Sequence, residues 1–421
     1  MTPREFALQV VEKLQAAGYQ ALWAGGCVRD AQMNRVPKDY DVATSATPDQ
    51  VRELFGKQRT LPIGASFGVI TVLGAKSAGP IEVATFRRDC GYSDGRRPDQ
   101  VEFTDAREDA LRRDFTINGM FFDPVANKVI DFVGGQQDLV GRQIRAIGDA
   151  HQRIEEDKLR MLRAVRFAVT LGFEIEAITL AAIKKHAVEI ECVSGERIGA
   201  ELRRMLAHPN RSRAAELLRM TGLLPAILPG ADVLYLNGHW ERCLQELNAL
   251  LSDNFPAAVV LLCEPYLQTD DGLETMIAAW KLSNEEKKLL RWAVKHQSTL
   301  LEADHRRWSE VQPLLIEKQI PLATATLAIL RSKVHSRQLS ESGIEFCEER
   351  LAWPQEKRNP LPLIDGATLI EMGVRRGPRF KKILDRCRAM QLDGEIQSAD
   401  DAKQIVIEMT SDMSRNGGEQ N

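Results

Sequence analysis

The sequence lacks the features of a disulfide scaffold, a zinc protein or a membrane protein. Its seven cysteines are scattered over 421 residues, and no two of them have the C-x-x-C spacing of a metal or redox site. We therefore expect reduced thiols in a cytoplasmic protein. The longest apolar run, residues 256–263, is far too short to cross a bilayer, so no membrane association is expected. The N-terminus has no apolar segment typical of a signal peptide.

The chain also lacks a large excess of either charge and any fixed repeat. Its formal net charge is −3, so nucleic-acid binding would need a local basic surface. Hydrophobic residues make up 44% and charged residues 27% of the chain, which is typical of a soluble globular protein. A chain of this length is too long for one ordinary hydrophobic core, so we expect two to four domains.

The most informative stretch that is present runs from Gly25 to Asp41. An apolar segment leads into Gly25 and Gly26, and paired glycines before a helix let backbone N–H groups approach an anion closely. Arg29 adds a forked donor for phosphate oxygens. Asp39 and Asp41 would share one face of an extended strand and offer two carboxylate ligands to Mg²⁺. This combination indicates metal-assisted transfer of a phosphoryl or nucleotidyl group.

Strand patterns fill the first 150 residues, and helical patterns fill the rest. A helix is expected over residues 1–20, strands over 69–73 and 81–86, and a second strand pair near 121 and 129–133. Ser/Thr–Glu/Gln capping boxes predict helices that begin at Thr2, Thr47 and Ser283. The change in character places a domain boundary near residues 147–150.

Two polar segments beside these strands each allow two interpretations. Glu82 lies within a mostly apolar strand, where it either shares a metal with the aspartates or faces water at a sheet edge. Residues 87–98 form a charged, turn-rich segment, which is either a mobile active-site element or a solvated connector. Residues 112–118 follow in a helix-like segment.

Residues 155–167 predict one amphipathic helix with an unusual charged face. Apolar residues share one side of it, and the opposite side carries Glu156, Asp157, Arg160, Arg163 and Arg166. Such a stripe is either a solvated face of salt bridges or a surface that reads a nucleotide.

The second interpretation depends on complementary hydrogen bonding. An aspartate only accepts hydrogen bonds and an arginine only donates them. Cytosine and adenine carry an amino donor beside a ring-nitrogen acceptor, whereas uracil and guanine carry the reverse pattern. Asp157 and Arg160, one helical turn apart, would therefore accept C and A and reject U and G. Arg163 and Arg166 could then hold phosphates.

The ordered set of motifs resembles the class II tRNA nucleotidyltransferases and bacterial poly(A) polymerases of the polymerase-β superfamily. Each motif is weak alone, but the set follows the family's order over about the first half of the chain. The matching pieces are Gly25-Gly26-x-Val28-Arg29-Asp30, Asp39-x-Asp41, Arg112-Arg113-Asp114-Phe115-Thr116-x-Asn118, Gly134-Gly135-x-x-Asp138-Leu139, Glu156-Asp157-x-x-Arg160-x-x-Arg163-x-x-Arg166-Phe167 and Glu196-Arg197. Residues 366–373, 377–378 and 391–395 also resemble the family's tail.

The resemblance implies an α+β fold, with a polymerase-β-like head of mixed sheet and helices followed by an all-α neck, body and tail. The expected bounds are 1–148 for the head, 149–210 for the neck, 211–355 for the body and 356–409 for the tail, with a disordered C-terminus over 410–421. After Asp30 the chain departs from the family's usual leucine-rich step and glycine. Asn34 can adopt the left-handed conformation that the glycine would supply.

The resemblance also implies roles for particular residues. Asp39 and Asp41 would hold two Mg²⁺ ions and Glu82 would support them as a third catalytic carboxylate. Nucleotide binding would fall to Gly26, Arg29, Arg113, Asp114, Glu156, Asp157, Arg160, Arg163 and Arg166, with Glu156 holding the Asp157–Arg160 pair in place. A basic run would bind RNA phosphates through Arg375, Arg376, Arg379, Lys381 and Lys382, with Arg386 and Arg388 nearby.

The implied reaction is addition of CCA to the 3′ end of tRNA from CTP and ATP, with pyrophosphate released. The expected RNA contact is the acceptor and TΨC region, and no DNA partner is expected. The apparent length of the segment 88–98 and the residues Ala65–Gly68 favour CCA addition over A-only addition, CC-only addition or poly(A) synthesis. A non-catalytic RNA-binding scaffold and a small-molecule nucleotidyltransferase remain as alternatives outside this activity.

Overall fold

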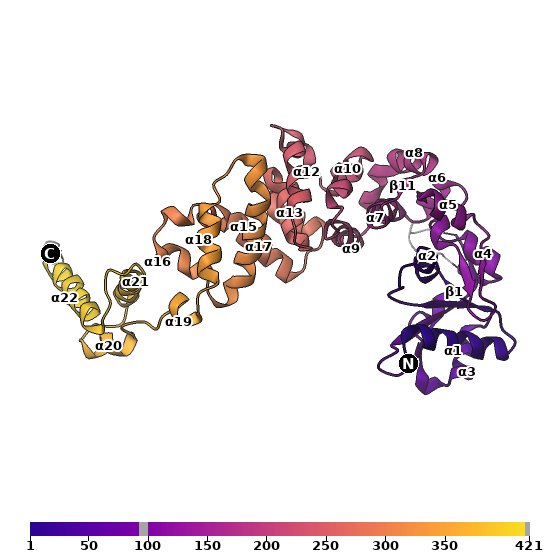
Figure 1. Ribbon diagram of the computed structural model, residues 1–421, viewed down its shortest axis with the longest axis horizontal. Coiled ribbons are helices and arrows are strands. Elements are labelled where there is room, and N and C mark those ends of the chain that lie inside the picture. The colour runs from indigo at the N-terminus through magenta and orange to yellow at the C-terminus, as the bar shows by residue number, and fades with distance from the viewer. Residues whose placement is uncertain (92–99, 417–421) are drawn as a thin grey trace. The chain divides into compact units, whose positions relative to one another are not determined.

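The computed structural model describes residues 1–91 and 100–416. The chain divides into two compact units, Met1–Asp232 with Ala278–Lys281 and Val233–Ile277 with Leu282–Asn421. Every strand in the described part of the chain lies in the first unit, and the second unit is helical there (Figure 1). The predicted α+β fold, with a sheet-containing head followed by helices, is confirmed.

Seven strands form the main sheet of the first unit. In chain order they are β1 (Ala21–Ala24), β2 (Asp41–Thr44), β3 (Thr60–Leu61), β4 (Val69–Leu73), β5 (Pro80–Thr85), β8 (Phe121–Asp123) and β9 (Lys128–Ile130). Their order in the sheet is β3-β4-β5-β2-β1-β8-β9, and the β2–β5 pair is parallel while the other pairs are antiparallel. Two short pairs stand apart from it: β6 (Arg87–Cys90) with β7 (Gln100–Phe103), and β10 (Gln143–Ile144) with β11 (Glu174–Ile175).

Helices make up most of the remaining described structure. Those that begin before residue 232 are α1 (Pro3–Ala16), α2 (Gly26–Gln32), α3 (Pro48–Phe55), α4 (Ala106–Leu111), α5 (Gly135–Gly141), α6 (Ala150–Glu156), α7 (Arg160–Leu171), α8 (Ala177–His186), α9 (Gly195–Leu206), α10 (Arg211–Met220) and α11 (Leu223–Ile227). Those that follow are α12 (His239–Ala249), α13 (Phe255–Leu267), α14 (Gly272–Ala279), α15 (Asn284–Leu301), α16 (Trp308–Val311), α17 (Ile320–Arg337), α18 (Ser342–Leu351), α19 (Gln355–Arg358), α20 (Gly366–Glu371), α21 (Pro378–Leu392) and α22 (Ala399–Asn416). Short 3-10 turns are η1 (Lys57–Arg59), η2 (Ala65–Phe67), η3 (Thr116–Asn118), η4 (Ala187–Cys192), η5 (Ala231–Tyr235), η6 (Ala303–His305), η7 (Gln312–Leu314) and η8 (Glu317–Gln319).

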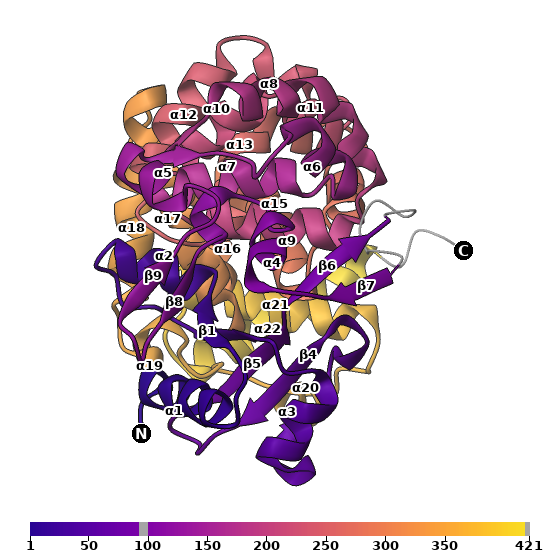
Figure 2. The same cartoon turned by 90° about the vertical axis from the view of Figure 1, so that its right-hand side faces the viewer.

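The alternation of side chains along the central strands decides what each face of the sheet carries. Val42 and Val83 belong to the core cluster that α1 and α3 cover (Figure 2). Their strand neighbours point the other way, where Ala43 packs with Phe86 and with the apolar side of α4. The second face is therefore the one to which the polar residues at positions 41 and 82 belong.

Local helix signals in the sequence are confirmed. Thr2, Thr47 and Ser283 each accept a hydrogen bond from the backbone of the third helical residue, whose own side chain accepts from the capping residue's N–H. Asn34 has the expected left-handed backbone, with φ of 56°. These features follow from neighbouring residues alone, which is why the sequence predicts them well.

Two expectations about chain segments are wrong. Residues 87–90 of the expected turn-rich segment instead form a strand that pairs antiparallel with residues 100–103, and residues 92–99 lie outside the described residues. Helix α22 continues through residues 410–416, where disorder was expected, and its residues Ile405, Val406 and Met409 pack into the cluster around α20 and α21. Residues 417–421 lie outside the described part.

The predicted start of the body at residue 211 differs from the observed division. Helices α10 and α11 belong to the first compact unit, whose main segment ends at Asp232. They pack on α7, α9 and η4, so the apolar faces of residues 211–227 are buried there. The other predicted domain boundaries stay predictions.

No single helix within residues 1–91 and 100–416 is long and apolar enough to cross a membrane. One bent pair, Trp308–Leu314 with Glu317–Arg337, reaches the required length and hydropathy, with a bend of 71° between its parts.

Candidate active site

Strands β2 and β5, together with the residues just before β2, bring three carboxylates to one place. Asp41 and Glu82 are direct neighbours across the parallel β2–β5 pair. Tyr40 is buried on the opposite side of the sheet, where its ring lies 4.9 Å from that of Trp23. Asp39 therefore shares the face of Asp41 although β2 begins only at residue 41, and both line the same cavity.

The electrostatics of Asp41 reflect this crowding. Burial, the charge of Asp39 and then the charge of Glu82 raise the pKa of Asp41 to about 6, while Arg113 acts in the opposite direction. A carboxyl group whose ionisation is opposed by two neighbouring carboxylates gains from a bound cation. The donor set is hard oxygen, which Mg²⁺ prefers.

The protein would supply only a few of the ligands of a bound Mg²⁺ ion. Within the described residues, no group of three or more His, Cys, Asp or Glu side chains is placed to hold a metal ion. Asp39 and Asp41 fit a site at which Mg²⁺ takes one or two carboxylates and completes its shell with substrate phosphates and water. Glu82 is adjacent to this pair and contributes negative charge to it.

Position 25 requires a glycine, both because of its backbone angles and because of the atoms around it. Its φ of 70° and ψ of −127° lie in a region that residues with a side chain avoid. A Cβ atom there would lie 3.2 Å from Nη1 of Arg113, whereas Gly26 is helical and a Cβ there would have nothing nearer than 3.8 Å. The first glycine thus lets α2 begin close to the arginine of another segment.

A buried aspartate fixes the segment that follows α4. Asp109, 1% exposed, binds Arg112 through one carboxylate oxygen and Arg113 through the other, at 2.7 and 2.9 Å. Arg113 also lies over the ring of Phe121 at 4.9 Å. The predicted helix does not continue through these residues: α4 ends at Leu111, and the turn η3 begins at Thr116.

Asp114 lies at the centre of a second buried pair. Its Oδ2 accepts hydrogen bonds from Nε and Nη2 of Arg163 at 2.9 and 2.5 Å, and its Oδ1 accepts from Asn118 and from the backbone N–H of Phe115. Burial alone would raise the pKa of Asp114, but Arg163 and these hydrogen bonds outweigh it and lower the pKa to about 2. The carboxylate therefore stays charged and fixed.

The single helix predicted over residues 155–167 is wrong. Helix α6 ends at Glu156, Asp157 has extended backbone angles of φ −149° and ψ 102°, and α7 begins at Arg160. The side chain of Asp157 accepts a hydrogen bond from the backbone N–H of Leu159. An aspartate that bonds to nearby backbone N–H groups competes with helical hydrogen bonding, and here it makes a break.

The break between α6 and α7 determines which protein atoms hydrogen-bond to Asp157 and Arg160, the two residues predicted to read the base. Oδ2 of Asp157 accepts a hydrogen bond from Nη2 of Arg197 at 2.8 Å. Arg160 donates from Nη1 to Glu156 at 2.6 Å and to the carbonyl oxygen of Arg153 at 2.8 Å, and from Nη2 to the carbonyl oxygen of Arg112 at 3.3 Å. Both side chains are thus held by protein atoms while they line the cavity of Asp41.

Two further arginines are also held by carboxylates. Arg166 donates to Glu201 at 2.5 Å and lies 3.8 Å from the ring of Phe167. Arg29 donates to Asp30 and, at 2.7 Å, to Oδ1 of Asn118. Such partners fix the direction of the remaining N–H groups of each guanidinium.

One cavity of about 860 Å³ is lined by most of these side chains, whereas Asp30, Asp109, Glu156, Arg197 and Glu201 hold its lining residues without lining it themselves. Its walls carry eight arginines and six carboxylates, so the space offers both cation ligands and anion ligands. The stripe from Glu156 to Arg166 is not a solvated face, because the side chains of Glu156, Asp157, Arg160, Arg163 and Arg166 are between 11% and 32% exposed.

Comparison with known proteins agrees with this geometry. Residues 21–145 match the model of the poly A polymerase head domain, and residues 172–235 match the model described as the probable RNA and SrmB-binding site of polymerase A. The CCA-adding enzyme of Levilactobacillus brevis is 33% identical over 94% of this chain and 95% of its own length. The chain belongs to the CCA-adding enzyme family.

Solved structures of the family share the fold. The Bacillus stearothermophilus CCA-adding enzyme in complex with CTP matches with a TM-score of 0.76 and 28% identity, over 99% of this chain and 100% of that chain. The Thermotoga maritima CCA-adding enzyme complexed with tRNA matches with a TM-score of 0.70 and 20% identity, over 96% of this chain and 95% of that chain.

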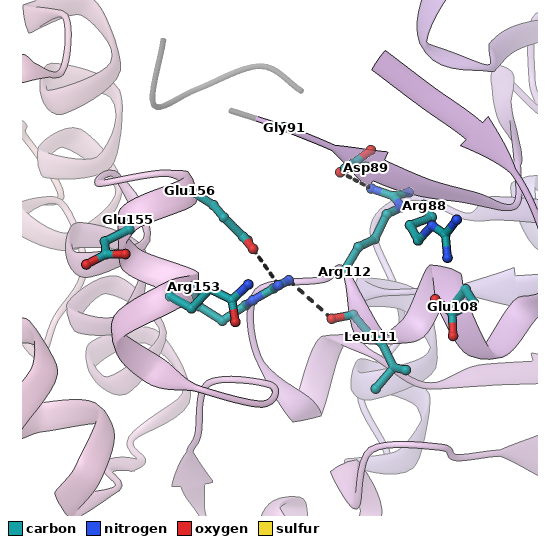
Figure 3. Close-up of a pocket in the computed structure, with 10 residues that line it drawn as sticks. Arg88, Asp89, Gly91, Glu108, Leu111, Arg112, Arg153, Glu155 and Glu156 are labelled. Atoms are coloured by element: carbon teal, nitrogen blue, oxygen red, sulfur yellow. Dashed lines mark hydrogen bonds and ion pairs between the residues drawn. The ribbon is translucent and has the colours of Figure 1, made fainter. Parts of the chain in front are cut away.

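The predicted site residues fall into three places. The cavity is lined by Asp39, Asp41, Glu82, Gly26, Arg29, Arg113, Asp114, Asp157, Arg160, Arg163 and Arg166. Glu156 lines an adjacent pocket of about 450 Å³ (Figure 3). The predicted RNA-binding residues lie in the second compact unit.

Those five basic residues are available for an anion. Arg375 and Arg376 precede α21, Arg379, Lys381 and Lys382 lie on it, and all five are exposed and form no ion pair among the described residues. Arg388 differs from the prediction, since its guanidinium binds Asn359 and the carbonyl oxygen of Pro360.

Three polar residues that the sequence motifs gave no role shape the site. Arg197, Glu201 and Asp109 bind Asp157, Arg166 and Arg113 respectively. Arg197 belongs to a motif that the family resemblance already contains, so its presence there was the one available signal. Glu201 lies within an amphipathic helix and gives no local sign that it is 3% exposed.

Proposed function

We propose that this member of the CCA-adding enzyme family is a template-independent tRNA nucleotidyltransferase that adds CMP, CMP and AMP from CTP and ATP to the tRNA 3′ end. The observation that carries the proposal is that the Asp157–Arg160 pair and the Asp39–Asp41 pair line the same cavity. One pair offers base-specific hydrogen bonds and the other offers metal ligands.

The hydrogen-bonding groups that Asp157 and Arg160 leave unused support the selection of C and A. A carboxylate has about four acceptor sites, and among the described residues Asp157 uses one on Oδ1 and one on Oδ2. Arg160 has five N–H groups, of which three are used, leaving Nε–H and one N–H on Nη2. Two acceptors and two donors remain, which fit the amino group and ring nitrogen of C or A.

Uracil and guanine would meet this surface with the wrong groups. Their ring N–H would face an arginine donor, and their carbonyl oxygen would face a carboxylate acceptor. Each buried polar group left without a partner costs about 1–3 kcal/mol. Two such groups support rejection of UTP and GTP by a factor of about 30 or more.

The reaction is attack of the RNA 3′-hydroxyl oxygen on the α-phosphorus of the bound nucleotide, with the bond to the pyrophosphate oxygen broken and pyrophosphate released. No covalent intermediate with the protein is needed. When bound, Mg²⁺ lowers the pKa of the hydroxyl and neutralises charge on the phosphates. Asp39 and Asp41 would hold the metal, Glu82 would support them, and Arg29, Arg113 and Arg163 would orient the triphosphate and ribose.

The basic surface at α21 would hold tRNA in the acceptor–TΨC region. Five exposed cations without ion pairs among the described residues suit phosphates. The cytoplasm is the proposed location, because the seven cysteines are free and five are buried, as in a reducing compartment.

The test is product analysis. tRNA that ends before CCA, or in CC, is incubated with CTP and ATP singly and together. The expected products are CC from CTP alone and CCA from both nucleotides, whereas a long A tract would indicate a poly(A) polymerase and no product would indicate a scaffold. Asp39→Ala and Asp41→Ala should abolish transfer while tRNA binding is kept, and full activity in either variant would contradict the metal assignment.

A-only and CC-only addition remain the alternatives within the family. The segment at 88–98 that favours CCA addition lies largely in residues 92–99, outside the described structure. Product analysis with the two tRNA ends separates these activities, because an A-adding enzyme acts only on the CC end.

A further inference from the structure

The guanidinium of Arg160 is fixed by three acceptors that belong to two segments of the first unit. Glu156 and the carbonyl oxygen of Arg153 occupy Nη1, and the carbonyl oxygen of Arg112 occupies one N–H of Nη2. These three bonds decide which two N–H groups remain to read a base.

Arg153 holds the other side of the same carboxylate. Its Nη2 lies 2.5 Å from Oε1 of Glu156 (Figure 3). Arg160 binds the other oxygen, Oε2. Its Nη1 donates to the carbonyl oxygen of Leu111 at 3.2 Å. Arg153 and Arg160 therefore take the two consecutive carbonyl oxygens at the end of α4, directly before Arg113.

The position of Arg153 separates it from the nucleotide. It lines the adjacent pocket with Glu155 and Glu156 and does not line the cavity of Asp39 and Asp41. Its side chain is 16% exposed, so its ion pair with Glu156 is largely shielded from water. Arg153 can therefore act on the nucleotide only indirectly, and its bonds to Glu156 and to the Leu111 carbonyl provide such a route.

Removal of Arg153 would change the donor set of Arg160. A carboxylate and a guanidinium prefer a two-point, parallel arrangement when both oxygens are free. With Oε1 released by Arg153, Glu156 could take a second N–H of Arg160, and one of the two N–H groups that read the base would no longer be available.

We propose that Arg153 is a positioning residue for base selection: by occupying Oε1 of Glu156 and the Leu111 carbonyl, it keeps the reading N–H groups of Arg160 free and aligned with Arg113. This role rests on the proposed reading function of Asp157 and Arg160. It assigns selectivity to a residue that does not touch the nucleotide.

The test compares kcat and KM for CTP and UTP on tRNA that ends before CCA, in Arg153→Ala and Arg153→Lys. We expect the CTP-to-UTP ratio of kcat/KM to fall about tenfold in both variants, because lysine cannot donate from a planar fork to Oε1 and to the Leu111 carbonyl. Glu156→Gln should lower the CTP-to-UTP ratio by the same factor, so the proposal can still be tested if Arg153→Ala does not fold. Arg142→Ala is the matched control, since Arg142 also donates to a backbone carbonyl, that of Gly172 at 3.2 Å, and lies outside both pockets.

The outcomes separate the two claims. If Asp157→Ala and Arg160→Ala lower the ratio while the Arg153 variants keep that of the wild type, the positioning role is overturned and the reading function stands. If the Arg153 variants slow CTP and UTP equally, Arg153 is only structural and the proposal is again overturned. If Asp157→Ala and Arg160→Ala leave the ratio unchanged, the reading function itself fails.

Discussion

Asp114 links the chemistry of one carboxyl group to the stability of the first unit. Burial alone would raise its pKa above the ordinary 3.8, but the charge of Arg163 and the hydrogen bonds from Arg163, Asn118 and the Phe115 N–H lower it to about 2. A group whose pKa is lower in the folded state stabilises the fold above its unfolded pKa, and that stabilisation disappears as the pH falls through the folded value. The lowered pKa of Asp114 corresponds to about 2 kcal/mol of folding free energy.

Asp114→Asn should therefore be less stable than the wild type by about 2 kcal/mol at pH 7. The difference should narrow as the pH falls from about 4 toward 2, where the wild-type carboxylate takes up its proton. Urea unfolding of both proteins over this pH range measures it, and a difference that stays constant with pH would contradict the account.

Arg197 is the residue that holds Asp157 in the break between α6 and α7. It is 40 residues away in sequence and donates at 2.8 Å. Arg197→Ala should raise the KM for CTP and ATP about tenfold, because Asp157 would lose the guanidinium that hydrogen-bonds its Oδ2 and fixes its position. Arg203→Ala on the same helix is the control, since Arg203 donates to the carbonyl oxygen of Lys281 instead. Equal effects of the two changes would argue against a specific role.

At the scale of an element, the turn into α2 separates two neighbouring glycines. Gly25→Ala should cost about 1–3 kcal/mol of stability, because its φ of 70° strains any side chain and the new Cβ would crowd Arg113. Gly26→Ala should leave stability nearly unchanged, since that position is helical and open. If the backbone there approaches a phosphate, Gly26→Ala should still weaken nucleotide binding. Thermal unfolding with CTP titration distinguishes these effects, and equal destabilisation by both changes would contradict them.

The elements show which features a sequence can predict. Helix caps at Thr2, Thr47 and Ser283 depend on residues three positions apart, and they were predicted correctly. The break at Asp157 was missed, because the apolar periodicity of residues 155–167 shows neither the bond of Asp157 to the backbone N–H of Leu159 nor its bond to the distant Arg197. The Asp41–Glu82 neighbourhood needs the β2–β5 register, which the local patterns did not supply.

At the scale of the whole molecule, the family resemblance predicted the order of the domains better than their boundaries. The head, its carboxylates and the helical remainder were predicted, whereas α10 and α11 belong with the first unit and α22 extends to Asn416. Such limits depend on long-range packing of apolar faces, which composition alone does not reveal.

The basic surface at α21 should contribute to RNA affinity and not to nucleotide affinity. Replacing Arg375, Arg376, Arg379, Lys381 and Lys382 by Ala should weaken tRNA binding at least tenfold. The slope of log affinity against log salt should become shallower by roughly 0.9 for each phosphate that the variant no longer neutralises. The KM for CTP should change little. Lys184→Ala with Lys185→Ala, on α8, is the control, and unchanged tRNA affinity after the five substitutions would remove the RNA-binding assignment.

The central claim is that Asp157 and Arg160 choose the base in the cavity that contains Asp39 and Asp41. It is tested most directly by single-turnover incorporation from CTP and from UTP into tRNA that ends before CCA. The wild type should use CTP and reject UTP, and the Asp157→Ala/Arg160→Ala double variant should reduce that selectivity by a factor of about 30 or more. A double variant that still rejects UTP as the wild type does would contradict the account.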